Sequence, residues 1–135
     1  MTDAQATGQA FRNAIEGWDI AAARELLAPD IVFHSPVTFH PFVGRDTVGS
    51  LLEIVGKTFE NFRYVDELSG EGTHELVFRA EVGGRELEGI DLLRIGDDGL
   101  IADFTVMIRP LSGLAPFAQR MGEQVQAAGI GTTRA

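Results

Sequence analysis

The segment LEGIDLLRI, residues 87–95, has the apolar content of a buried strand but carries a carboxylate, Asp91, in its middle. Two glycine-containing turns flank it, Gly83-Gly84 before it and GDDG at residues 96–99 after it. Because glycines supply the positive φ that tight hairpins require, the segment is predicted to pair with both neighbouring strands in an antiparallel sheet. The surroundings of Asp91 in that sheet therefore decide what its carboxyl group can do.

The two turns predict which side chains share a face with Asp91. A two-residue turn at Gly83-Gly84 places Leu76 opposite Asp91. A turn across residues 96–99 places Phe104 opposite it on the other side. Side chains alternate along a strand, so the other members of this face follow in steps of two. The predicted face is almost wholly apolar and holds Leu76, Phe78, Ala80, Leu87, Leu93, Ala102, Phe104, Val106 and Ile108.

The opposite face of the predicted sheet mixes apolar and charged side chains. It carries Val77, Ile90, Leu92 and Met107 together with Arg79, Glu88, Arg94, Asp103 and Thr105. A sheet with one apolar and one mixed face is covered by helices on the first face, while the second is partly solvated or paired with another subunit. We therefore expect helices over the Asp91 face and a homodimer through the outer face.

A carboxylate on the apolar face loses its hydration. Burial disfavours the charged form, so the pKa of Asp91 is expected to rise and the group to act as a neutral hydrogen-bond donor. Such an acid is either a catalytic group or a structural one paired with a backbone group, a water molecule or a basic side chain. Burial alone leaves both interpretations open.

Helical spacing of apolar residues predicts four helices around this sheet. They are expected at residues 3–17, 19–27, 46–60 and 111–128. Asp3 and Asp19 are the candidate N-caps of the first two, and the second must end before Pro29 because the residue preceding proline is pushed out of the α region. Strands are expected at residues 31–35, 62–68, 74–82, 85–95 and 100–109, with His74 facing solvent at the start of an edge-like strand.

Composition limits the classes of function. The 135 residues, 44% of them hydrophobic, predict one domain over 1–135. The formal charge of −9 and the lack of a basic cluster argue against nucleic acid or an anionic membrane as a partner. The chain has no cysteine and no visible signal peptide or spanning segment, so a cytoplasmic location is expected.

The order of these elements resembles a known superfamily. DIVFHSP at residues 30–36, GRD at 44–46, GIDLLRI at 89–95 and DGLI at 98–101 are similar to segments of nuclear transport factor 2, ketosteroid isomerase and the SnoaL-type polyketide cyclases. The resemblance covers a core of residues 8–110. It implies an α+β cone, in which a curved antiparallel sheet wraps around N-terminal helices, with an apolar pocket and commonly a homodimer. The helix at 111–128 is an addition to this core that either covers the pocket or lies on a sheet edge.

Within this resemblance, Asp91 matches the protonated oxyanion-hole aspartate of ketosteroid isomerase. Two other roles do not carry over, because Ser35 stands where that enzyme has its general-base aspartate and Phe11 where it has a tyrosine. Since serine without a base cannot remove a proton from carbon, steroid isomerisation by that route is not expected. SnoaL-type cyclases need one acid or base in an apolar cavity, a requirement that Asp91 alone meets.

The candidate site residues follow from these patterns. The candidate catalytic residues are Asp91, His34 and Ser35, although strand alternation puts His34 on the face opposite Phe33 and Ser35. The candidate ligand-binding residues are Phe11, Trp18, Phe33, His40, Leu52, Phe78, Phe104, Val106 and Ile108. An Asp-Arg-Asp set of epoxide hydrolase type is not expected, because Asp103 and Arg109 face outward. No metal-ligand spacing or phosphate-binding motif occurs, so neither a metal nor a cofactor is expected.

Two functional hypotheses follow from the sequence. In the first, Asp91 is an acid or base that acts on a small apolar carbonyl or polyketide-like compound, as an isomerase, a cyclase or a hydrolase would. In the second, the cone binds a hydrophobic ligand or only dimerises, and Asp91 orients or stabilises. The same fold serves both kinds of protein, so the choice depends on the geometry of the site.

Overall fold

The computed structural model describes residues 3–131, so the first two and last four residues of the predicted domain lie outside the described part. Its helices are α1 (Asp3–Glu16), α2 (Ile20–Glu25), α3 (Arg45–Thr58) and α4 (Leu111–Ala127). Its strands are β1 (Leu27–His34), β2 (Phe42–Val43), β3 (Glu60–Gly70), β4 (Thr73–Val82), β5 (Arg85–Ile95) and β6 (Ile101–Arg109).

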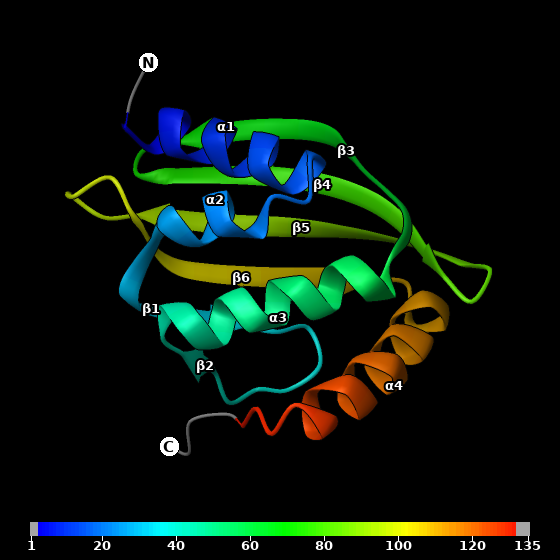
Figure 1. Cartoon of the computed structure of the whole chain (residues 1–135). Helices are drawn as coiled ribbons and strands as arrows, with labels where there is room; N and C mark the ends of the chain where they lie inside the picture. Colours follow the sequence, from blue (N-terminus) through cyan, green and yellow to red (C-terminus); the bar gives the residue numbers. More distant parts are fainter. Residues whose placement is uncertain (1–2, 132–135) are drawn as a thin grey trace.

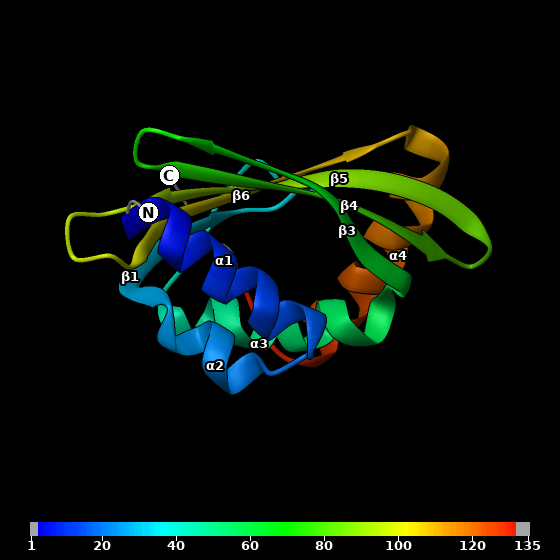
Figure 2. The ribbon, with the colours of Figure 1, turned by 90° about the horizontal axis from the view of Figure 1, so that it is seen from above.

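All six strands form one sheet in the order β2-β1-β6-β5-β4-β3. Figure 1 shows α1, α2 and α3 lying across one face of it, and the view from above in Figure 2 shows that this face is concave. The helix α4 lies below the far end of the sheet, where it leaves the last strand and turns back beside α3. The predicted α+β cone with a C-terminal helix is therefore confirmed. None of the described helices is long and apolar enough to cross a membrane.

The predicted β4–β5 hairpin is confirmed residue by residue. Val82 pairs with Arg85 and Leu76 with Asp91. The β5–β6 pairing differs from the prediction by two residues, so Asp91 lies opposite Val106 instead of Phe104. One residue of this shift arises at the turn, where Ile95 pairs with Ile101, and the other at an irregularity between Arg94 and Ile95. A shift of two residues keeps every side chain on its face beyond the irregularity.

The irregularity does change the face of one residue next to it. Ile101 pairs with Ile95 and is buried, whereas Ala102 is exposed, so the prediction that Ala102 belongs to the inner face is wrong. Such an extra residue in one strand locally turns the neighbouring side chains.

The first third of the chain departs most from its prediction. The helix α2 ends at Glu25, and Leu27 already belongs to β1, which pairs in parallel with β6 and also with the short strand β2. The sheet is therefore mixed, with one parallel pair. Asp19 caps α2 by accepting a hydrogen bond from the backbone N–H of Ala22, as predicted, but Asp3 lies inside α1 and is not its N-cap.

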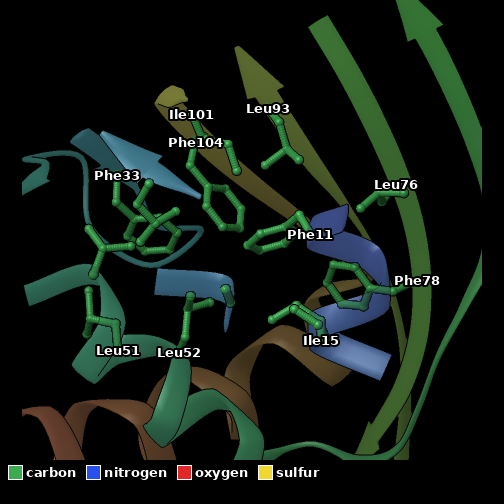
Figure 3. Packing of buried hydrophobic residues seen from close by; sticks show 14 of the residues in the cluster. Phe11, Ile15, Phe33, Leu51, Leu52, Leu76, Phe78, Leu93, Ile101 and Phe104 are labelled. Carbon is green, nitrogen blue, oxygen red and sulfur yellow. The ribbon is translucent and has the colours of Figure 1, made fainter. Parts of the chain in front are cut away.

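The concave side holds the hydrophobic core. Figure 3 shows Phe11 of α1, Phe104 of β6 and Phe33 of β1 pointing toward one another. Phe104 meets the other two rings edge to face, with centroids 5.4 Å from that of Phe11 and 5.1 Å from that of Phe33. This geometry is the favourable one for aromatic pairs. These contacts fix α1 and β1 against the middle of the sheet.

Candidate functional site

A cavity of about 120 Å³ lies between the concave face of the sheet and the helices. Its lining is almost entirely apolar and aromatic. The described C-terminal helix supplies part of the wall through Phe117, Met121, Gly122 and Val125. Of the two places that the sequence left open for this helix, it therefore occupies the one over the cavity.

Asp91 lies in the wall of this cavity, at the centre of β5. Asp91 is only 6% exposed to solvent. Burial raises the pKa of the Asp91 carboxyl from its ordinary value of 3.8 to about 7, although a hydrogen bond from Tyr64 acts in the opposite direction. Both the acid and the carboxylate are thus present near neutral pH, which is the condition for efficient proton transfer.

Tyr64 is the partner of Asp91 that the sequence reasoning missed. Its hydroxyl donates to Oδ2 of Asp91 over 2.8 Å, and its ring also lines the cavity. Burial raises the pKa of the Tyr64 hydroxyl well above 10, and the neighbouring Asp91 carboxylate raises it further, so the hydroxyl keeps its proton. Tyr64 and Asp91 thus form one buried, hydrogen-bonded acidic pair in an otherwise apolar cavity wall.

A second polar cluster lies behind Tyr64. The guanidinium carbon of Arg12 is 5.7 Å from the centroid of the Tyr64 ring, and Nη1 of Arg12 donates to Glu67 over 2.6 Å. The other oxygen of Glu67 lies 2.5 Å from Nε2 of His74, whose Nδ1 contacts Ser69 over 2.8 Å.

His74 is the polar residue whose position differs most from its prediction. It was expected to face solvent on an edge-like strand, but it is 1% exposed. The strand β4 is not an edge, since β3 lies outside it, and His74 faces inward like Leu76 and Phe78 two and four residues later. The side-chain alternation that correctly placed Leu76 and Phe78 on the inner face also places His74 there.

The candidate catalytic residues His34 and Ser35 separate as strand alternation predicts. His34 does not line the cavity, and its Nε2 lies 3.0 Å from Asp103 on the neighbouring strand. Ser35 does line the cavity, but its Oγ accepts hydrogen bonds from the backbone N–H groups of Val37 and Thr38. Within residues 3–131, no histidine or carboxylate contacts Ser35 to activate it.

Most of the candidate ligand-binding residues surround the cavity. Those that line it are Phe11, Trp18, Phe33, Leu52, Phe78, Phe104 and Val106. Two do not line it, because His40 lies in an exposed loop and Ile108 lies farther along β6, beyond the cavity wall. Among the residues described, no three histidine, aspartate or glutamate side chains gather in a metal-binding arrangement.

Comparison with known proteins fits this geometry. A family model described as the SnoaL-like domain matches residues 9–104. The chain belongs to the SnoaL-like family. No functionally curated protein matches its sequence significantly.

Solved structures show the same fold as this SnoaL-like domain. A steroid delta-isomerase from Pseudomonas aeruginosa is 38% identical, with a TM-score of 0.88 over 95% of each chain. A protein with a cystatin-like fold from Silicibacter pomeroyi is 29% identical, with a TM-score of 0.86 over 91% of this chain and 87% of that one. An NTF2-like protein of unknown function from Cytophaga hutchinsonii is 18% identical, with a TM-score of 0.65 over 82% of this chain and 93% of that one. The last of these shows a likeness in fold alone.

Proposed function

We propose that this SnoaL-like domain binds a small apolar molecule with a carbonyl group and that Asp91 transfers a proton to or from that molecule. The observation that carries the proposal is the buried Asp91 carboxyl, with its pKa raised to about 7, in the wall of an apolar cavity. The similarity to a steroid delta-isomerase supports this class of chemistry, because a double-bond shift next to a carbonyl proceeds by proton transfer.

The size of the cavity limits the ligand. Ligand pockets typically enclose about 300–1,000 Å³, and a cavity of about 150 Å³ holds a molecule such as benzene. The cavity here measures about 120 Å³, which is close to the volume that holds one ring. We therefore propose a monocyclic or short-chain carbonyl compound as the substrate.

The chemistry follows from having one carboxyl in the cavity wall. The Asp91 carboxylate takes a proton from the carbon next to the carbonyl and leaves an enolate; the neutral acid then returns the proton to carbon or oxygen. The Tyr64 hydroxyl donates to Oδ2 and stabilises the carboxylate form of Asp91, which is present before the first step and again after the second. An isomerisation or a ring closure can use this single acid–base group, whereas a serine nucleophile would need a base that Ser35 lacks.

Deuterium exchange tests the proposal without knowledge of the substrate. We expect the protein to accelerate exchange of the α-hydrogens of cyclohexanone in deuterated water at neutral pH, as followed by proton NMR. The Asp91→Asn variant should lose roughly 100-fold or more of this acceleration, because an amide cannot accept the proton. Asp97→Asn, in an exposed turn, is the matched control and should exchange at the rate of the parent.

Binding is measured in the same variants through Trp18, the one tryptophan of the chain, which lines the cavity. Asp91→Asn should still change the Trp18 fluorescence on addition of the ketone. Equal exchange rates in the parent and in Asp91→Asn would contradict the catalytic proposal.

The second candidate function is binding of a hydrophobic ligand without chemistry. One observation favours it. Ser35 stands where ketosteroid isomerase has its general base, but its hydroxyl oxygen already accepts hydrogen bonds from backbone N–H groups of the following loop. Under this function the fluorescence change at Trp18 occurs, and the parent protein gives no accelerated exchange.

We also propose that two copies pair through the outer face of the sheet. Apolar side chains lie exposed across its central strands, with Ile90 opposite Met107 and fractional exposures of 38% and 58%. Val65 on β3, at 47%, extends this strip. An exposed apolar strip of this kind on a sheet is typical of an interaction surface.

Sedimentation equilibrium tests the pairing. The parent is expected to be a dimer at roughly micromolar concentration, and Met107→Lys a monomer, because a buried ammonium group opposes association. Leu111→Lys, a substitution at another exposed apolar residue, should leave the dimer intact. A parent protein that sediments as a monomer contradicts the proposal.

A further inference from the structure

We propose that Arg12, held in place by Glu67 and His74, is a positioning residue that orients the Tyr64 hydroxyl toward Asp91. The inference rests on the proposed function, since it gives the Tyr64–Asp91 pair its role. It concerns a cluster that lies outside the cavity lining, because Arg12, Glu67 and His74 do not belong to the cavity wall. Three local features of the chain build this cluster. Each of them alone is energetically costly or unusual.

The first feature is an irregularity in β3. Tyr64 and Glu67 are three residues apart and would point to opposite faces of a regular strand. The register of β3 against β4 shifts between Tyr64 and Asp66, and the residues between Tyr64 and Glu67 are exposed while these two are not. The extra residue therefore turns Glu67 to the same face as Tyr64, which is the effect of a β-bulge.

The second feature is the burial of His74 beneath α1. Gly8 leaves the space that the imidazole occupies, because a Cβ at this position would overlap the ring of His74. In this place His74 contacts Glu67 through Nε2 and Ser69 through Nδ1. A ring that is protonated on Nε2 donates to the Glu67 carboxylate, so both nitrogens are satisfied although the side chain is buried.

The third feature is the position of Arg12 itself. Its Nη1 is 2.6 Å from Glu67, and its Nε is 3.4 Å from Glu16 on the same helix. These two acids restrain the guanidinium, which lies 5.7 Å from the centroid of the Tyr64 ring. A planar guanidinium held by carboxylates is well suited to packing on an aromatic ring.

The Tyr64 ring is thus held from more than one direction. Arg12 lies over it, and Phe62 meets it edge to face with centroids 5.0 Å apart. The charged and titratable groups that face Tyr64 are Arg12 and Glu16 from α1 and Asp91 from β5. Because the position of the ring fixes where the hydroxyl oxygen lies, the contacts on the ring hold that oxygen within hydrogen-bond distance of Asp91.

A double-mutant cycle read by NMR tests this inference. The quantity measured is the pKa of Asp91, from the pH titration of its carboxyl carbon in the protein without ligand. Tyr64→Phe removes the hydrogen bond that lowers this pKa, so the pKa should rise. Arg12→Met should raise it too, by about half a unit or more, because a loosened ring no longer aims its hydroxyl. In the double variant the pKa should match that of Tyr64→Phe alone, since Arg12 acts through Tyr64.

Further variants separate orientation from charge. Arg12→Lys keeps the positive charge but loses the planar fork, and it should raise the Asp91 pKa as Arg12→Met does. Arg85→Met, which removes one exposed arginine at the β4–β5 turn, should leave the pKa unchanged. Additive shifts in the double variant, or a parent-like pKa in Arg12→Lys, would overturn the inference. An Asp91 that titrates near 4 in the parent would instead contradict the proposed function, and the coupling would still be measured.

Discussion

Asp91→Asn is expected to stabilise the folded protein at pH 8 by about 2–4 kcal/mol. The rise of the Asp91 pKa from 3.8 to about 7 on folding corresponds to a cost of up to about 4 kcal/mol for burying the charged form. Asparagine has nearly the same shape and accepts the Tyr64 hydrogen bond, but it carries no charge. Part of the gain is offset because the buried amide must also find a hydrogen-bond partner.

The pH dependence has a definite sign. Below about pH 4 both the folded and unfolded states hold the Asp91 proton, so the pKa difference contributes nothing. Between about pH 4 and 7 the unfolded chain releases the proton while the folded protein keeps it, and stability therefore falls as pH rises. Above pH 7 the full cost is present. The advantage of Asp91→Asn should thus grow across this window and then level off.

Urea unfolding from pH 4 to pH 8 measures this difference. Asp97→Asn, in the exposed β5–β6 turn, is the control for the loss of one acidic group and should follow the parent. If the stability difference between Asp91→Asn and the parent does not change with pH, Asp91 is not a buried acid of raised pKa.

Gly89→Ala is expected to destabilise the protein by about 3 kcal/mol. Gly89 lies opposite Phe78 in the sheet, and a Cβ there would overlap the Phe78 ring and lie 2.7 Å from the carbonyl oxygen of Met107. The backbone of a central strand cannot move aside, and Phe78 is fully packed in the core. The added methyl group must therefore push the ring toward the cavity or distort the pairing of β5 with β6.

Gly122→Ala is the matched control for this substitution. Gly122 also lines the cavity and belongs to α4, but apart from its chain neighbours and the nearby backbone of its own helix, no described atom lies within 4 Å of the position that an added methyl group would take. Alanine favours a helix over glycine, so this variant should gain about 0.5–1 kcal/mol. Thermal or urea unfolding of the two variants gives the comparison, and a Gly89→Ala protein as stable as the parent would contradict the packing described for Phe78.

Turn chemistry made the sheet predictable. The Gly83-Gly84 turn has positive φ at both positions, as a two-residue hairpin requires, and the β4–β5 register followed from it correctly. The β5–β6 register was wrong by two residues, because neither the one-residue shift at the turn nor the irregularity next to Ile95 leaves a mark in the alternation of side chains. The parallel pairing of β1 with β6 joins segments far apart in the chain, and it was not predicted, because the family resemblance implied an antiparallel sheet.

The site was also predictable only in part, because contacts between distant segments and strand irregularities leave no pattern in the sequence. Asp91 stood out because it is a charged residue in an apolar alternation, whereas Tyr64 is an ordinary residue in a strand. Its contact with Asp91 crosses an intervening strand and follows a bulge, and neither can be deduced from spacing. His74 differs, because its inward position followed from the same alternation as that of Phe78, and the prediction failed by treating β4 as an edge.

The parallel contact between β1 and β6 also bears on when the chain can fold during synthesis. β1 has only the two-residue strand β2 on one side, and its other neighbour, β6, is the last of the described strands to be made. Closing so long a loop carries a large entropic cost before any contact compensates for it. While the ribosome is still making the middle of the chain, the nascent β1 therefore has an unpaired edge. We expect such chains, arrested before β6, to depend on chaperones in a way that the completed protein does not.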